Sequence, residues 1–202
     1  MSIFRKVEIS IVLGIVTSIL FSVFSFAQTS TQIRQNVLRL HVIANSDSAV
    51  DQNLKIAVRD AVLNEGGKIF DGSVTVENAV EKITPHIDEL TEIARGVISE
   101  YGLSYDVDVS IDNEYFETRT YENVTLPAGK YLSLIIKIGE GEGKNWWCVM
   151  FPPMCISAAD EENTLKTVLN QKEIKLVSKK PRYEPRFKLV EIYESFKYKI
   201  FG

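Results

Sequence analysis

The sequence has few of the residues on which metal and nucleophilic chemistry depend. Its 202 residues include two cysteines and two histidines, with no CxxC or HxxxH spacing among them. Because metal sites in proteins are built from ligands clustered at such spacings, the sequence predicts neither a metal site nor a cofactor.

An excess of basic residues is also absent. The formal net charge is −4 at pH 7, whereas non-specific nucleic-acid binding needs a basic surface. We therefore expect no nucleic-acid partner. The content of hydrophobic residues is 45% and that of aromatic residues 10%, which is sufficient for a globular domain with its own core.

The N-terminus carries the longest uncharged stretch. Ile9–Ala27 follows Arg5 and Lys6 and precedes the polar sequence QTSTQ. This pattern fits a signal peptide cleaved at its end, but about 19 residues are also nearly enough for an uncleaved membrane anchor. In both cases the basic residues stay in the cytoplasm and the rest lies outside. We expect this targeting segment over residues 1–27 and a single globular domain over residues 34–202.

The first part of the domain predicts a strand and a helix. Residues 36–44 alternate in a way typical of a strand. Turn-forming residues follow, and Ser48 with Asp51 resembles a capping box at the start of a helix that runs to about Asn64. Gly66-Gly67 are predicted to stop that helix.

A second helix and four more strands are predicted farther along. The helix covers residues 76–101, and Pro85 should kink or split it near Thr84. Strands are expected at residues 105–111, 115–121, 130–138 and 146–150, with a hairpin turn at Asp112-Asn113. Residues 186–192 suit either a short helix or a strand. The sequence thus predicts an α+β fold, with a mostly antiparallel sheet of about five strands and two long helices packed on one face.

The loop GEGEG at residues 139–143 is rich in glycine, as phosphate-binding loops are. Such loops join a strand to a helix and present amides to the anion. This loop joins two predicted strands, and its two glutamates would repel phosphate. We interpret it as a hairpin connection.

Cys148 is the one candidate nucleophile. With His41 as base and an acid such as Asp47 it would make a thiol hydrolase, although the surrounding sequence has no nucleophile signature. Two states are open for Cys148 and Cys155: a disulfide, as in many exported proteins, or two buried free thiols.

Trp146 and Trp147 are consecutive residues of a predicted strand. Alternation sends their indoles to opposite faces, so one should fill the core beneath the helices. The other either covers the open face or lies exposed beside Phe151. An exposed indole there could anchor a protein partner or stack on the sugars of the cell wall.

Two blocks of the sequence resemble a known family. Leu38–Leu63, and Leu126–Cys155 with its segments LPAGKY, GEGEGKNWWC and FPPMC, are similar to stage II sporulation protein R. The N-terminal signal and the block RFKLVEIYE at residues 186–194 agree with this resemblance. The similarity covers nearly the whole chain and is weakest over residues 68–99 and 160–184.

The resemblance implies an intercompartment signal and not an enzyme. Members of that family are made in the forespore and exported toward the space between the forespore and mother-cell membranes. There they trigger a membrane-embedded aspartic protease, stage II sporulation protein GA, which processes the precursor of sigma-E. We expect this protease as the partner and the membrane as a contact of the N-terminal segment. The alternatives are an extracytoplasmic thiol hydrolase and a cell-wall-binding module.

A contact surface for the protease is our own hypothesis, drawn from residues inside the two blocks. The candidate residues are His41, Asn45, Ser46, Asp47, Asn145, Trp146, Trp147, Phe151, Pro152 and Pro153.

Overall fold

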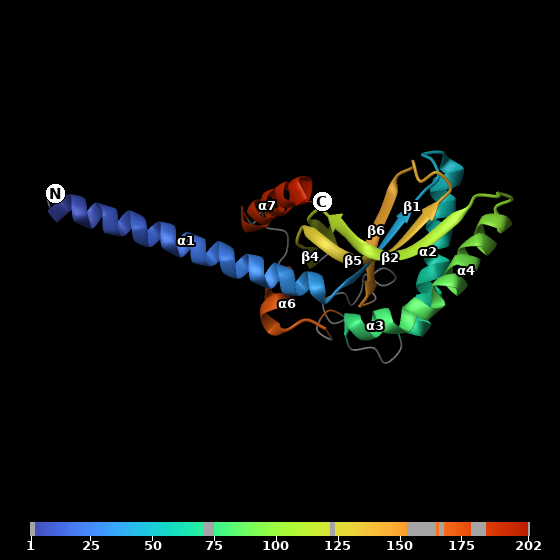
Figure 1. Cartoon of the computed structure of the whole chain (residues 1–202), viewed down its shortest axis with the longest axis horizontal. Helices are drawn as coiled ribbons and strands as arrows, with labels where there is room; N and C mark the ends of the chain where they lie inside the picture. The colour runs from blue at the N-terminus through green and yellow to red at the C-terminus, as the bar shows by residue number, and fades with distance from the viewer. Residues whose placement is uncertain are drawn as a thin grey trace.

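A four-stranded sheet forms the centre of the folded part, and a long N-terminal helix leads into it (Figure 1). The computed structural model describes residues 3–70, 75–121, 124–152, 165, 168–178 and 185–201. The helices are α1 (Ile3–Gln35), α2 (Ala49–Ile69), α3 (Val76–Ile83), α4 (Ile87–Glu100), α6 (Gln171–Val177) and α7 (Pro185–Phe201), and the 3-10 turn η1 (Thr84–His86) separates α3 from α4. The strands are β1 (Leu38–Ile43), β2 (Val107–Phe116), β3 (Arg119–Tyr121), β4 (Val124–Leu126), β5 (Gly129–Ile138) and β6 (Asn145–Phe151).

The fold is α+β, as predicted, but the predicted sheet of five mostly antiparallel strands is wrong. The strand order is β2-β5-β1-β6, with β1 parallel to β5 and antiparallel to β6, while β3 and β4 form a separate two-stranded sheet. The first strand of the chain is inserted between β5 and β6. The loop from β5 to β6 is therefore not a hairpin connection, because it must cross the end of β1.

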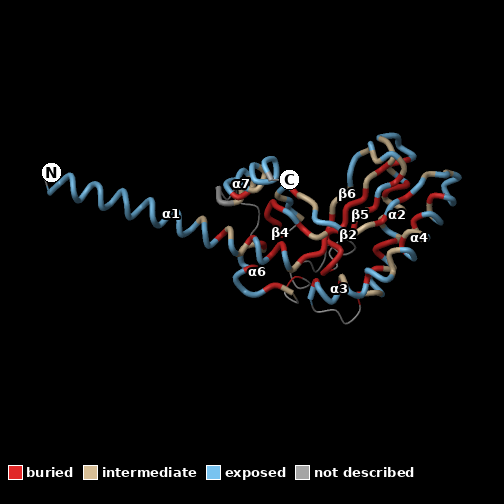
Figure 2. Tube along the Cα trace, viewed as in Figure 1, coloured by how far each residue is buried: buried red, intermediate tan, exposed pale blue. Residues whose placement is uncertain are grey.

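Each face of the sheet has its own hydrophobic cluster. Leu40 and Val42 of β1 join the cluster formed with α2, α3 and α4. On the other face, Phe116, Tyr131 and residues of β4 and α6 pack with the end of α1. Burial on both sides is seen in the tube of Figure 2, where the central strands are mostly buried. β1 is therefore enclosed on both faces, unlike a strand of an open antiparallel sheet.

Two local predictions are confirmed. The long second helix is divided at the predicted place, since α3 ends at Ile83 and η1 begins with Thr84 and Pro85. Proline lacks the amide hydrogen and clashes with the preceding turn, so it fits a helix start better than a helix interior. Ser48 is the N-cap of α2, and its hydroxyl accepts a hydrogen bond from the amide of Asp51 (3.1 Å).

Two other local predictions are wrong. Gly66-Gly67 do not stop α2, which continues to Ile69. A Cβ on Gly66 would lie 2.4 Å from Met150 Cε, so this glycine allows α2 to approach β6 closely. Nor do Asp112-Asn113 form a turn: β2 continues through them because both residues pair with β5.

The N-terminal helix runs without interruption past the end of the predicted targeting segment. Figure 2 shows that it is exposed along most of its length. Phe26 is its first buried residue. Within the described residues, α1 is the one helix long and apolar enough to cross a membrane, a test that signal sequences near an N-terminus also pass. The C-terminal helix α7 packs beside the end of α1, and residues 186–192 are helical, the first of the two predicted forms.

Candidate functional site

The predicted polar residues after β1 surround a buried carboxylate. Asp51 is almost fully buried and accepts hydrogen bonds from Ser46 Oγ (2.5 Å) and Asn45 Nδ2 (2.9 Å). Hydrogen bonding by the Ser46 hydroxyl is the main cause that holds the pKa of Asp51 below its usual range, against the opposing effect of burial. Asn45 and Ser46 therefore stabilise the first turn of α2, and their side chains form hydrogen bonds within the domain.

The loop from β5 to β6 lies over the end of β1 and is bonded to it. The amide of Glu140 donates to Asn45 Oδ1 (3.1 Å), that of Gly143 to the carbonyl of Ala44 (2.9 Å), and that of Lys144 to Asp47 Oδ1 (2.7 Å). The remaining amides of this segment, at residues 139, 141 and 142, also donate to carbonyls of the chain. Every N–H of residues 139–144 thus has a protein acceptor, and none is available to cradle a phosphate.

Part of this region is exposed. Asp47, Lys144 and Asn145 are exposed, and we call these three residues the strand-end surface. Beneath it the nearly buried ammonium group of Lys55 donates to the carbonyl of Lys144 (2.9 Å). Burial lowers the pKa of Lys55. The surface is supported by polar contacts below it, as a rigid contact site requires.

His41 lies on the face of β1 opposite to α2, α3 and α4. Its ring stacks on Trp147 with centroids 3.7 Å apart, and a hydrogen bond of 2.7 Å joins Nδ1 to Glu114 Oε2. His41 is almost completely buried, whereas Glu114 is partly exposed. His41 is therefore a packed side chain, held between Trp147 and Glu114.

The proposed pairing of His41 with Cys148 is not geometrically possible within the sheet. Cys148 pairs with Leu40 and faces the helix side, while His41 pairs with Trp147 and faces the other side. Cys148 is also disulfide-bonded. Cys155 lies outside the described residues, so the pairing of Cys148 with Cys155 stays a prediction.

The two indoles face opposite sides of the sheet, as predicted, and both are half-buried. Trp146 packs against the helix-side cluster, with the guanidinium of Arg59 4.2 Å from its ring centroid. Trp147 packs on the other side with His41 and Phe116. Both indoles are therefore partly covered, and the role of either one as an anchor for a partner stays a prediction.

The remaining predicted contact residues do not join the strand-end surface. Phe151 and Pro152 are buried at the other end of β6, about 20 Å from Asn145 at the rise of an extended strand. Pro153 lies outside the described residues. The candidate residues therefore form separate groups and not one continuous patch.

Sequence reasoning missed the environment of Arg39. This residue of β1 has no exposed surface, and its guanidinium lies 4.3 Å from the ring centroid of Phe116 and 5.2 Å from that of Tyr131. Nη2 donates to Tyr121 Oη (2.6 Å), while Nε and Nη1 have no hydrogen-bond partner among the described residues. Burial lowers the pKa of Arg39. A lone arginine in an alternating strand looks like an exposed position, and no sequence signal separates the two cases.

An open cavity lies elsewhere, at the junction of α1, α3, β2 and α7. Its volume is about 1120 Å³, and Arg34, Glu77, Asn113, Lys130 and Lys197 are among its lining residues. None of the predicted contact residues lines it. The described residues contain no group of three or more His, Cys, Asp or Glu side chains that could hold a metal ion.

The fold and these contacts define the protein as a mixed-sheet α+β domain attached to an apolar N-terminal helix. The family model for stage II sporulation protein R (spore_II_R) matches residues 34–161, and the chain belongs to that family. It is 38% identical over 123 residues to stage II sporulation protein R of Bacillus subtilis (strain 168). This match covers 61% of the chain and 55% of the relative. No solved structure matches the chain.

Proposed function

We propose that the protein is an exported sporulation signal. In this role it triggers a membrane-embedded aspartic protease, stage II sporulation protein GA, to process the precursor of sigma-E in the mother cell. The family match over residues 34–161 carries the proposal, because it spans every strand of the central sheet. The apolar helix α1 supports export, with Arg5 and Lys6 remaining in the cytoplasm of the forespore.

The strand-end surface is the part of the domain that we assign to the protease contact. β1 runs away from α1, so its C-terminal end lies on the side of the domain far from the N-terminal helix (Figure 1). A domain held by α1 at the forespore membrane would present this end across the intermembrane space. A protease in the mother-cell membrane, on the far side of that space, would face the strand-end surface, which is why we assign the contact to it.

The test is reconstitution of the full chain with the protease and the sigma-E precursor, scored for cleavage of the precursor. We expect cleavage with the unaltered chain and a strong loss with Asn145→Arg, which places a bulky charge on the strand-end surface. Gln171→Arg introduces the same side chain at an exposed position of α6, near α1, and should leave cleavage unchanged.

The two parts of the proposal fail separately. Absence of cleavage with the unaltered, folded chain would disprove the signalling function. Normal cleavage with a folded Asn145→Arg variant would leave that function intact and remove the strand-end surface as the contact.

A further inference from the structure

The C-terminal helix α7 has an apolar face that points away from the domain. Leu189, Ile192, Tyr193, Phe196 and Ile200 follow the spacing of one helix face, and between 49% and 64% of each residue is exposed. A helix that only packs on a soluble domain turns such a face inward. This exposed row of five residues is here called the α7 stripe.

The opposite face of α7 is fastened to the domain, which fixes the outward direction of the stripe. Glu194 pairs with Arg34 of α1 (3.0 Å), Val190 is buried, and the ring of Tyr198 stacks on Tyr115 of β2 at 5.1 Å. These contacts come from three successive turns of the helix. The stripe therefore cannot turn inward without breaking all of them.

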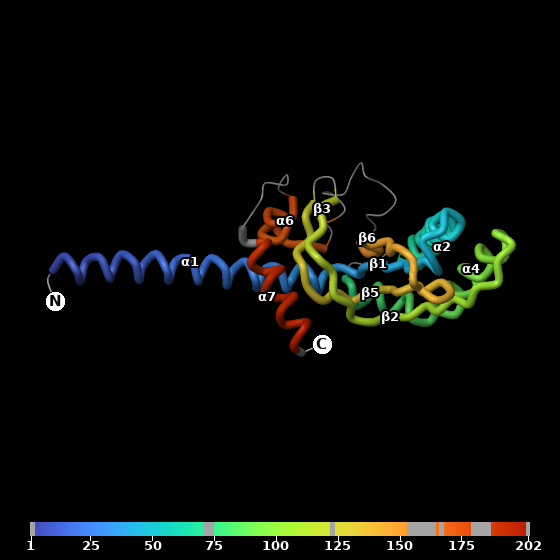
Figure 3. Tube along the Cα trace, turned by 90° about the horizontal axis from the view of Figure 1, so that it is seen from above, coloured from blue at the N-terminus to red at the C-terminus, as the bar shows by residue number. Residues whose placement is uncertain are grey.

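The position of α7 relates the stripe to the apolar part of α1. Phe187 contacts Phe26 with ring centroids 4.9 Å apart, and Phe26 is where burial of α1 begins. The exposed apolar segment before it, from about residue 9, is about 26 Å long at 1.5 Å per residue, close to the thickness of a bilayer core. α7 thus lies at the level where α1 would leave a membrane, and it runs across the line of α1 (Figures 1 and 3).

The charges beside the stripe complete the pattern of a helix that lies in a membrane surface. Lys199 flanks it on one side and Lys197 on the other, and both are exposed. Glu194 is neutralised by Arg34 and Glu191 by Lys188, whereas no carboxylate in the described part of the chain pairs with Lys197 or Lys199. An apolar face bordered by lysines is typical of helices that bind anionic lipid.

We propose that the α7 stripe binds the surface of an anionic lipid bilayer beside the point where α1 enters it. The domain is then held by two contacts, a helix that enters the bilayer and a helix that lies on it. Such a pair restricts the tilt of the domain, so that the strand-end surface is directed away from the membrane. The lipid contact itself does not depend on the proposed signalling function.

The test uses the full chain in phosphatidylcholine vesicles with and without phosphatidylglycerol. Ile192 or Phe196 is replaced by the photo-reactive p-benzoylphenylalanine, and the products of illumination are identified by mass. Val50, an exposed apolar residue of α2, receives the same group as a matched control. We expect severalfold more lipid adduct at Ile192 and Phe196 than at Val50, and a decrease when Lys197→Glu and Lys199→Glu are combined or phosphatidylglycerol is omitted.

Other products would overturn the proposal. Adducts between two copies of the chain in place of lipid adducts would identify the stripe as a self-association surface. Lipid adducts no more frequent than at Val50 would show that the stripe does not touch the bilayer. Circular dichroism of each variant in the same vesicles distinguishes a lost contact from a lost fold.

Discussion

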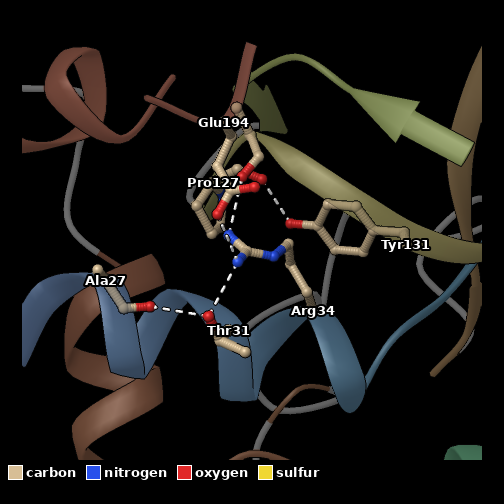
Figure 4. A network of polar contacts seen from close by, with 7 residues as sticks. Ala27, Thr31, Arg34, Pro127, Tyr131 and Glu194 are labelled. Carbon is tan, nitrogen blue, oxygen red and sulfur yellow. Dashed lines mark hydrogen bonds and ion pairs between the residues drawn. The ribbon is translucent and has the colours of Figure 1, made fainter. Parts of the chain in front are cut away.

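Arg34 of α1 and Glu194 of α7 form a 3.0 Å ion pair that joins residues 160 positions apart in the chain. The other terminal nitrogen of Arg34 donates to the carbonyl of Ala128 at 2.9 Å. Tyr131 donates to the neighbouring carbonyl of Pro127 at 2.6 Å, as Figure 4 shows. The N-terminal helix, the turn before β5 and the C-terminal helix therefore meet at one largely buried guanidinium.

Replacing this arginine should destabilise the fold markedly. Arg34→Ala leaves the carboxylate of Glu194 and the carbonyl of Ala128 without their donor, and breaking a buried pair costs about 3 kcal/mol. The measurement is the free energy of unfolding in urea. Arg95→Ala breaks an exposed pair with Glu92 and should cost less than about 1 kcal/mol. Equal losses in the two variants would contradict the structural role of Arg34.

Two glycines offer a matched comparison of the loop over β1. A Cβ on Gly143 would lie 2.3 Å from the backbone oxygen of Ser46, whereas one on Gly67 in α2 meets no atom within 4 Å. Gly143→Ala should therefore displace the loop and lower the free energy of unfolding by at least about 1 kcal/mol. Gly67→Ala should raise it by about 0.5–1 kcal/mol, because alanine favours the helix. An unchanged free energy of unfolding in Gly143→Ala would show that the loop is not closely packed.

The buried carboxylate of Asp51 should make stability depend on acid pH. Its folded pKa lies below its usual value, which is near 4 in an unfolded chain. The ionised form therefore contributes stability that is complete above about pH 5 and is lost as the pH falls through the folded pKa. Urea unfolding at several pH values should show a higher free energy of unfolding for the unaltered chain than for Asp51→Asn, and this difference should become smaller below about pH 4. A difference that becomes larger in acid would contradict a stabilising role of ionised Asp51.

The predicted disulfide can be tested directly. Non-reducing digestion should yield a single species that joins the peptides of Cys148 and Cys155, and reduction should separate them. Because the closed loop is short, its loss in Cys148→Ser should cost about 2 kcal/mol, the low end of the usual range. Alkylation of both thiols in the untreated, unfolded chain would disprove the bridge.

The local elements of the fold could be predicted because their signals are local. Ser48 before a polar turn and Pro85 inside a helical pattern each act on a few neighbouring residues, and both predictions are confirmed. The order of the strands could not be predicted, since insertion of β1 between β5 and β6 depends on contacts between distant residues. Asp112-Asn113 has turn composition, but pairing with β5 outweighs that preference.

The local structure around the candidate polar residues could be predicted in part, because the turn after β1 is also a local signal. Asn45 and Asp47 lie among the turn-forming residues that follow the first predicted strand, and in the structure they bond to the start of α2 and to the crossing loop. The link between Arg34 and Glu194 left no trace in the sequence, because either charge alone looks like an ordinary surface residue. The pairing exists only once the two ends of the chain come together.

Substitutions of Arg39 can test whether its buried charge stabilises or destabilises the fold. Its guanidinium is enclosed by aromatic rings, with one hydrogen bond to Tyr121 and two nitrogens without partners among the described residues. Burying a charge without a carboxylate is costly, so an apolar side chain of similar size is expected to be tolerated or even to stabilise the protein, by about 1–4 kcal/mol in comparable cases. Arg39→Met should therefore equal or exceed the unaltered chain in its free energy of unfolding.

Arg39→Ala is the matched variant, because it removes the charge and also leaves a cavity. The cavity should cost about 2–4 kcal/mol, so Arg39→Ala is expected to be less stable than Arg39→Met. Tyr121 also donates to the carbonyl of Trp147 (3.4 Å), a hydrogen bond that does not involve Arg39. Tyr121 loses the same partner in both variants, so this loss does not distinguish them. If Arg39→Met lost as much stability as Arg39→Ala, the interaction of the guanidinium with the aromatic rings would have to exceed the cost of its burial.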